Sequence, residues 1–386
     1  MVPMEGGERS AGVDHAELAT PVVEAFRRLN PTVDLRIREL SERQLGSVLR
    51  LQQRRGLGPD LLLVRAPVAI SLLRAGLVDP VPTNSLMRQS LDSLEPSSLL
   101  RVREGEKLAG LPVAKETTLA CYDTKRVAQA PRTLDELLAL SAAGHPIGVA
   151  VNPIGIWWSA GPFRATHALI PVITGRPATP PQPRAEALQS LERWLEWLRA
   201  LALQSRVDIA TGEDSAQQLV RGLINGRLAW IPCYSLSLLP LSQAMGARLG
   251  VGVLPSGAEG PASPFSAERV WAFGTDSSPR QRQLAEALAR LSVDPMLQRQ
   301  ITLTNQATLP VNRFTSVPVA ASGRLAAMAL AQEQFRSGSS GLGMPFSAAR
   351  VQRVLPRIEA TIFEAMVGVL TPARAAQALL DLEKVP

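Results

Sequence analysis

Hydrophobic positions along the chain recur with two different periods, which predict helices alternating with strands. Residues 14–29 place their apolar side chains at helical spacing, and residues 33–37 then alternate apolar and polar side chains as a strand does. After a helical stretch at 41–55 and the turn GLGPD, the apolar run LLLV at 61–64 is typical of a strand inside a sheet. A helix followed by a strand is half of an α/β repeat.

The same alternation continues toward the C-terminal end. Thr133 and Glu136 form a capping box that predicts a helix start, and residues 185–204 carry one apolar helical face. The last part of the chain predicts two helices, the second beginning with Thr371 and Pro372. Further strands are expected in HPIGVAVNP (145–153), RLAWIPCY (227–234), RLGVGVLPSG (248–257) and AERVWAFG (267–274). So many strands argue for two α/β lobes.

One predicted strand, in KLAGLPVAKETTLACYDTKRV (107–127), is interrupted by polar residues at its centre. Lys115 and Glu116 are followed by two threonines before the apolar pattern resumes. A strand that only fills a core has no use for a charged pair in its middle. We therefore expect the break to mark a special position in the strand.

Length and charge narrow the class of protein. The 386 residues exceed the roughly 250 to 300 at which single cores stop growing. The sequence contains no run of 18 or more apolar residues, so no membrane span is predicted. The 41 basic residues outnumber the 34 acidic ones, but they are scattered, which favours a solvated basic surface over nucleic-acid binding. The opening MVPMEGGERS has no signal-peptide pattern, so either a cytoplasmic protein or a mature exported one is expected.

Residues that could carry catalysis do not form a known pattern. The sequence has no GxSxG elbow, phosphate-binding loop, GxGxxG or HExxH motif, and its three histidines stand in unrelated contexts. Cys121 and Cys233 lack metal-ligand spacing. Two buried thiols are the preferred interpretation, and one disulfide is the alternative for an exported chain. These observations favour a binding protein, without metal or cofactor, over an enzyme.

Several phrases, in order along nearly the whole chain, resemble one family: the extracellular solute-binding proteins of ABC importers, in the maltose-binding-like, carbohydrate-binding group. VVEAFRRLNPTVDLRI is similar to the family's opening helix and second strand, and LAGLPVAKETTLACYDTKRV to the strand that passes its hinge. Other similar phrases are GPDLLLVRAPVAISLLRAGLVDPV, PRTLDELLAL, LINGRLAWIPCY and VGVLPSG.

The resemblance implies an α/β, two-lobed periplasmic binding protein fold of type II, with hinged lobes and a central ligand cleft. Lobe 1 would comprise residues 1–113 and 256–314, and lobe 2 residues 114–255 and 315–386. It also implies a monomeric receptor, periplasmic or tethered as a lipoprotein, that closes on a small sugar or glycoside and delivers it to the permease subunits of an ABC transporter.

The sequence departs from the family pattern in two respects, and the second bears on the ligand. The first strand of the family is reduced here to MVPM. Aromatic residues make up only 4% of the chain, which favours a mono- or disaccharide or a small glycoside over a long maltodextrin.

Candidate ligand contacts follow from the resemblance and from sugar chemistry. A sugar presents an apolar face and a rim of hydroxyls, so its site needs an aromatic surface and fixed hydrogen-bonding groups. The resemblance implies that residues 111–119 cross between the two lobes and carry Glu116 into the cleft between them. Glu116 matches a family position whose carboxylate accepts hydrogen bonds from sugar hydroxyls. In an extended segment only one of Trp157 and Trp158 would face the ligand. The full set of candidates is Glu5, Glu8, Arg65, Glu116, Asn152, Trp157, Trp158, Trp230, Tyr234 and Trp271.

Alternatives stay open at this point. Core packing is the competing interpretation for Trp230 and Trp271, and a solvated loop is the one for Glu5 and Glu8. Arg65 would equally suit an anionic solute such as a sugar phosphate or a glycerol phosphodiester. An enzyme on the same fold would act through Cys121, Cys233 or Glu116.

Overall fold

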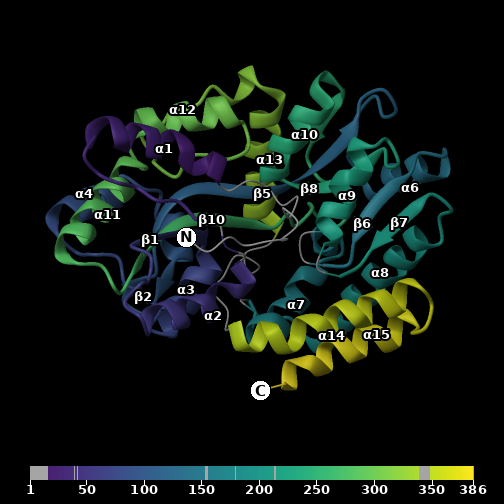
Figure 1. Cartoon of the computed structure of the whole chain (residues 1–386). Coiled ribbons are helices and arrows are strands. Elements are labelled where there is room, and N and C mark those ends of the chain that lie inside the picture. Colours follow the sequence, from purple (N-terminus) through teal and green to yellow (C-terminus); the bar gives the residue numbers. More distant parts are fainter. Residues whose placement is uncertain are drawn as a thin grey trace.

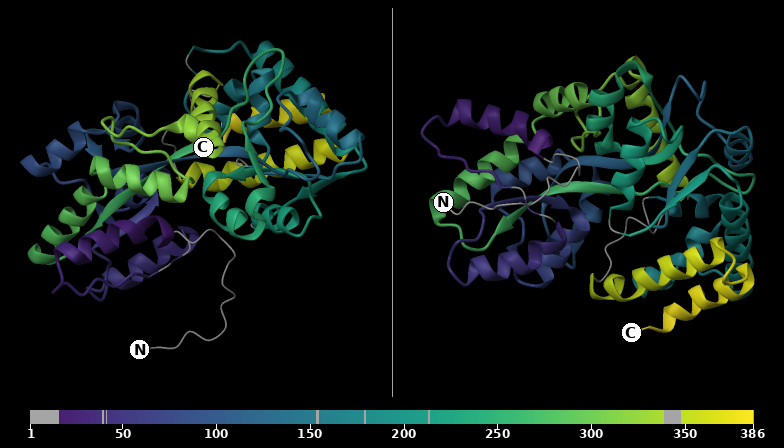
Figure 2. Two further views of the ribbon diagram at one scale, coloured as in Figure 1. Left: turned by 90° about the horizontal axis from the view of Figure 1, so that it is seen from above. Right: turned by 45° about the vertical axis from the view of Figure 1, so that its right-hand side comes forward.

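The computed structural model describes residues 16–38, 40, 42–152, 155–178, 180–212, 214–338 and 348–385. Two α/β lobes lie side by side and are joined by long strands that run from one into the other (Figure 1). The view from above in Figure 2 shows the same two lobes. Within the described ranges, no helix has the length and apolar character needed to cross a bilayer.

The main sheet has the strand order β1-β10-β5-β8-β6-β7. These strands are β1 (Leu61–Arg65), β10 (Ser266–Gly274), β5 (Leu111–Asp123), β8 (Trp230–Tyr234), β6 (Ile147–Ala150) and β7 (Val207–Ala210). Two further strands extend the sheet, because β2 (Val78–Asp79) pairs with β10 and β9 (Leu249–Gly252) pairs with β5. A separate short hairpin joins β3 (Arg103–Glu104) to β4 (Lys107–Leu108).

Strand β5 belongs to both lobes because it changes partners halfway along. Its first half, up to Thr117, pairs with β10, and from Thr118 onward it pairs with β8 and β9. The polar interruption seen in the sequence lies at this exchange. The prediction that residues 111–119 cross between lobes agrees with this pairing.

The helices of lobe 1 cover the β1, β2 and β10 part of the sheet (Figure 1). They are α1 (Ala16–Leu29), α2 (Glu42–Gln53), α3 (Ala66–Arg74), α4 (Ser85–Asp92), α5 (Pro96–Arg101), α11 (Pro279–Leu291) and α12 (Pro295–Asn305). Two hydrophobic clusters form the core of this lobe, one beneath α1 and α11 and the other beneath α2 and α3.

Lobe 2 surrounds β6, β7, β8 and β9. Its helices are α6 (Leu134–Ala142), α7 (Ala165–Thr174), α8 (Arg184–Ala202), α9 (Ser215–Ile224), α10 (Leu238–Met245), α14 (Ala348–Met366) and α15 (Pro372–Asp381). Helix α8 packs against α7, α14 and α15, and its tryptophans lie in the large core between them. Helix α13 (Gly323–Gly338) packs against β5 and β9.

Local sequence signals mark several element ends correctly. Thr133 and Glu136 form the expected capping box of α6, and Thr371 caps α15 with Pro372 in its first turn. Residues 33–37, predicted as a strand, form none, because their backbone makes no hydrogen-bonded ladder with another strand of the described residues. The lobe boundaries expected at residues 113, 255 and 314 stay a prediction.

A disulfide joins Cys121 of β5 to Cys233 of β8. The two strands are neighbours, and the ladder sets Leu119 opposite Cys233 and Cys121 opposite Ile231, so the cysteines are diagonal partners. The preferred interpretation of two free thiols was wrong, and the alternative of one disulfide is confirmed. Sequence alone could not show this, because the two cysteines are 112 positions apart and only the fold pairs β5 with β8.

Candidate functional site

Four charged or polar side chains come together where the strands cross between the lobes. The sheet register pairs Arg65 of β1 with Arg269 of β10, places Glu116 of β5 two residues from the partner of Arg269, and pairs Tyr234 of β8 with Thr118. Because side chains two residues apart share a face, these four lie on one face of four neighbouring strands. We call Arg65, Arg269, Glu116 and Tyr234 the crossing cluster.

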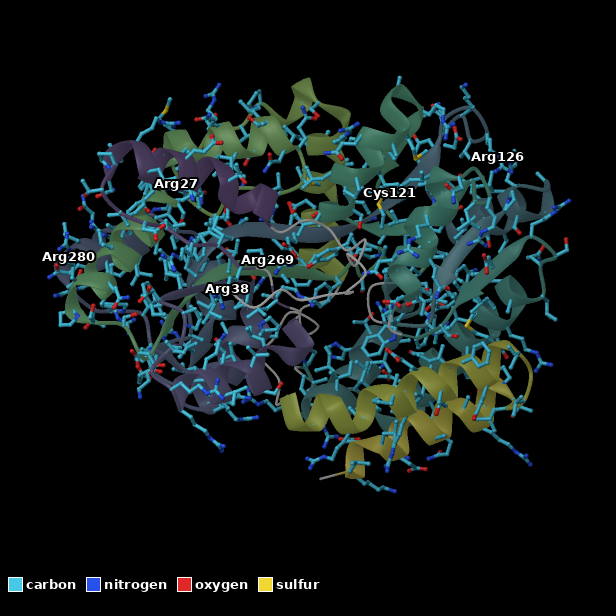
Figure 3. All side chains as sticks on the ribbon, viewed as in Figure 1. Arg27, Arg38, Cys121, Arg126, Arg269 and Arg280 are labelled. Atoms are coloured by element: carbon cyan, nitrogen blue, oxygen red, sulfur yellow. A yellow bond between two sulfur atoms is a disulfide. The ribbon has the colours of Figure 1, made fainter. Side chains whose placement is uncertain are left out.

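A buried ion pair forms the centre of the crossing cluster. Arg269 donates from Nε to Oε1 of Glu116, and the two side chains are 2% and 0% exposed. Figure 3 shows Arg269 near the middle of the molecule, on β10. Two charges withdrawn from water in this way must pair, since an unpaired buried charge costs several kcal/mol.

The ion pair leaves two hydrogen-bonding atoms unused. Oε2 of Glu116 and the hydroxyl oxygen of Tyr234 are both buried, and neither makes a hydrogen bond of ordinary distance and angle with a described residue, although the phenol lies close enough to interact with the Glu116 carboxylate. Burial raises the pKa of the Tyr234 phenol well above its usual range, and the negative charge of Glu116 raises it further. Tyr234 is therefore a neutral hydrogen-bond donor beside a carboxylate acceptor.

Arg65 completes the crossing cluster from the lobe 1 side. Its side chain is half-buried at the end of β1, and its positive charge acts with that of Arg269 to lower the pKa of Tyr234, against the raising effects of burial and of Glu116. The structure thus brings together three of the predicted site residues: Arg65, Glu116 and Tyr234. Arg269 was missed, although a charged residue inside the apolar strand AERVWAFG was a signal comparable to that of Glu116.

The predicted tryptophans lie in the lobe cores. Trp157 and Trp158 belong to the 3₁₀ helix Trp157–Phe163 and are both buried, as is Trp230, in the core of lobe 2. The expectation that one of the pair faces a ligand assumed an extended chain, which the helix contradicts. Trp158 meets Trp230 edge to face at 6.0 Å between ring centroids. Trp271 is buried in lobe 1 and donates to Ser292 Oγ at 3.1 Å.

The remaining candidates are not part of the crossing cluster. Asn152 shapes the turn after β6, because its Oδ1 accepts from the amide of Gly155 at 2.7 Å and its Nδ2 donates to Ser215 Oγ at 2.8 Å. A ligand-binding role for Asn152 would compete with these bonds. Glu5 and Glu8 lie outside the described residues.

The opposite face of the crossing strands carries a second buried polar group. Glu268 precedes Arg269 on β10 and so points to the other side. Its Oε1 accepts from Arg101 Nη1 at 3.0 Å and from Ser98 Oγ at 3.3 Å. Burial raises the pKa of Glu268 to about 7, although Arg101 and Lys115 act in the opposite direction.

That second group links the crossing strands to two helices. Ser98 and Arg101 come from α5, and Gln332 of α13 donates to Ser266 Oγ on β10 at 2.9 Å. Lys115, directly opposite Glu268 in the ladder, pairs with Glu95. This network ties the strands to the helices beneath them, and none of its members was predicted from the sequence.

Groups suited to catalysis are few. Among the described residues, no three His, Cys, Asp or Glu side chains are grouped so that they could hold a metal ion. Both cysteines are in the disulfide, so neither sulfur is a free thiolate nucleophile. Glu116, the third group considered for an enzyme, is bound to Arg269.

No protein-family model matches the chain, and no curated protein compared with it is similar in sequence. Solved structures do match over almost the whole length. The maltotriose-binding protein of Thermus thermophilus, bound to maltotriose, has a TM-score of 0.74 at 18% identity and covers 96% of both chains. The fold is that of the maltose-binding proteins.

Two more solved structures agree with the maltose-binding protein fold. The GacH receptor of Streptomyces glaucescens, known unliganded and with acarbose, has a TM-score of 0.69 at 13% identity and covers 97% of this chain and 95% of its own. The maltose/maltodextrin-binding domain of Bdellovibrio bacteriovorus, bound to maltotriose, has a TM-score of 0.72 at 16% identity and covers 96% of both chains. The two-lobed α/β fold predicted from the sequence is confirmed.

Proposed function

We propose that the protein is the solute-binding receptor of an ABC importer. It captures a small carbohydrate or glycoside between its lobes and delivers it to the membrane permease. The observation that carries this proposal is the buried pair of unused atoms, Glu116 Oε2 and the Tyr234 hydroxyl, at the strands that join the lobes. The similar structures bound to maltotriose or acarbose support it.

The unused pair matches a hydroxyl group of the solute. A hydroxyl both donates and accepts, so one solute hydroxyl can donate to Glu116 Oε2 and accept from Tyr234. A buried polar atom without a partner costs about 1–3 kcal/mol, so filling both positions favours the bound state. A neutral hydroxyl meets this pair without the repulsion that a carboxylate would experience from Glu116 at the same position.

The aromatic residues favour a small solute. All six tryptophans of the chain are described, and all are buried in the cores. The ring of Tyr234, a member of the crossing cluster, contacts that of Phe265, with 6.2 Å between the ring centroids. Long maltodextrins need a row of exposed rings on which successive sugars stack. A mono- or disaccharide, or a glycoside of that size, suits the site better.

Binding and lobe movement are coupled in this proposal. Glu116 and Arg269 are buried, so a solute reaches them when the lobes separate. Arg65 lies on the lobe 1 side of the sheet and Tyr234 on the lobe 2 side, so a bound solute touches both and favours the closed state. The disulfide fits an oxidising compartment such as the periplasm, where the receptor acts as a monomer, free or as a tethered lipoprotein.

A thermal-shift screen of mono-, di- and trisaccharides, polyol glycosides and sugar phosphates tests the proposal. A solute at a hundred times its dissociation constant adds about 2.7 kcal/mol of stability, which shifts the midpoint by several degrees. Tyr234→Phe and Glu116→Gln should weaken binding of that solute. Tyr122→Phe is the matched control, because it removes the chain's other phenolic hydroxyl. No shift with any of these compounds would contradict a carbohydrate receptor.

One observation favours a second candidate solute. Two arginines, Arg65 and Arg269, lower the pKa of Tyr234, whereas Glu116 is the single carboxylate that raises it. A sugar phosphate or glycerol phosphodiester would use Arg65 for its phosphate and the pair of unused atoms for its hydroxyls. The same screen separates the two candidates: only the phosphorylated solute would lose most of its affinity in Arg65→Gln.

A further inference from the structure

A second surface of lobe 1, on the outside of the molecule, has the features of a docking site. Helices α1, α11 and α12 meet there, at the end of lobe 1 away from β6 and β7 (Figure 1). Between them lies a hollow of about 370 Å³, which we call the α1 groove. Its lining residues include Ala25, Arg28, Leu291, Met296, Arg299 and Leu303.

Exposed apolar side chains lie in and beside the groove. Met296 is 74% exposed, and Leu29, next to Arg28 at the end of α1, is 70% exposed. Leu303, one helical turn beyond Arg299, is exposed as well. Single exposed apolar residues are common, but apolar side chains gathered around one hollow are typical of interaction sites.

The charged residues that line the groove are all basic. Arg28 and Arg299 line it, and none of its described lining residues is acidic. Within the described part of the chain, neither arginine makes an ion pair. A neighbouring hollow of about 440 Å³, which shares Leu291, adds Arg290. Its acidic residue, Asp294, is already used to cap α12 by accepting from the amides of Met296 and Leu297.

Charge and shape together narrow the occupant. A second copy of the same chain is a poor match, because it carries the same net charge of +7. In a symmetric pairing of this face with itself, arginines would also meet arginines. A bilayer surface is broad and flat, whereas the groove is a concave hollow between helices. An amphipathic segment with apolar side chains on one face and carboxylates at its edges matches both features.

We propose that the α1 groove binds an acidic, amphipathic segment of a partner protein. Its apolar side chains enter beside Met296 and Leu303, and its carboxylates pair with Arg28 and Arg299. The groove is separate from the crossing cluster, so this inference stands whatever solute the receptor binds, and the two are tested separately.

The test uses the full chain and a defined probe. The probe is a helical peptide with leucines along one face and glutamates along its edges, compared with a scrambled peptide of the same composition. Binding is measured by fluorescence anisotropy for wild type, Arg28→Glu/Arg299→Glu and Met296→Ala. The matched controls are Arg206→Glu/Arg221→Glu and Leu203→Ala on lobe 2, where Leu203 is as exposed as Met296.

The expected result is preferential binding of the amphipathic peptide, weakened about tenfold by the Arg28/Arg299 reversal and unchanged in the controls. Equal binding of the scrambled peptide, or equal loss in the lobe 2 variants, would show a general charge effect and overturn the proposal. Binding to phosphatidylglycerol vesicles that depends on Met296 would assign the groove to a membrane instead. A dimer in light scattering that Met296→Ala abolishes would assign it to a second copy.

Discussion

Arg269 and Glu116 form a buried ion pair between β10 and β5, the two strands that connect the lobes. The arginine holds one carboxylate oxygen, and the other oxygen stays buried without a partner among the described residues. The same pair therefore stabilises the crossing and prepares a hydrogen-bond acceptor for a solute.

The ion pair predicts an unequal response to single and double substitutions. Arg269→Met leaves the buried carboxylate of Glu116 unpaired and should lower the free energy of unfolding by about 3–5 kcal/mol. The double variant Arg269→Met/Glu116→Gln should recover part of this loss. Urea unfolding of wild type, Arg269→Met, Glu116→Gln and the double variant measures the coupling between the two side chains. If the stability losses of the single variants simply add in the double variant, a direct interaction is contradicted.

The disulfide predicts a large redox effect on stability. Cys121→Ala/Cys233→Ala should lower the free energy of unfolding by about 2–5 kcal/mol, because the bond closes a loop between positions 112 residues apart. Thermal unfolding with and without a reductant measures the effect. The reductant should have no influence on the double variant, and an equal effect there would point to a cause other than this bond.

Glu268 predicts a pH dependence of stability. Its pKa is raised from 4.5 to about 7 in the folded state, mainly by burial, so the folded protein binds this proton more tightly than the unfolded chain does. The resulting stabilisation is complete below about pH 4.5 and is lost as the pH rises through about 7. The change is at most about 3 kcal/mol.

Comparison with Glu268→Gln isolates this effect from other titrating groups. The stability of wild type relative to Glu268→Gln should fall between pH 4.5 and pH 7, as measured by urea unfolding at several pH values. A constant difference across that range would show that Arg101 and Lys115 keep the carboxylate charged throughout.

The hydrogen bonds of Arg350 are expected to stabilise the C-terminal end of the chain. Its buried guanidinium donates to the carbonyl oxygens of Val172, Leu382, Glu383 and Val385, and so ties the last turn to α7. Arg350→Met should cost about 1–3 kcal/mol, since carbonyl groups lose their donors. Hydrogen exchange should rise at the amides of 382–385 while those of β5 stay protected. Unchanged exchange there would contradict this role.

Local patterns in the sequence determined much of the fold. The helix starts at Thr133 and Thr371 depend on contacts within one turn, so neighbouring residues suffice to predict them. The polar break at Glu116 is also local, and it correctly indicated a special position in the crossing strand. The resemblance to maltose-binding-like proteins added the two-lobed architecture, and the solved structures confirm that fold.

Tertiary structure alone decided how the candidates combine. Arg65, Arg269, Glu116 and Tyr234 come from strands far apart in the sequence, and only the order β1-β10-β5-β8 places them on one face. The same holds for the bond between Cys121 and Cys233. The tryptophans show the converse. The chemistry of the four candidate tryptophans suggested ligand stacking, but whether a ring faces a ligand or a core depends on what covers it, and here all four are buried in the lobe cores: Trp157, Trp158, Trp230 and Trp271.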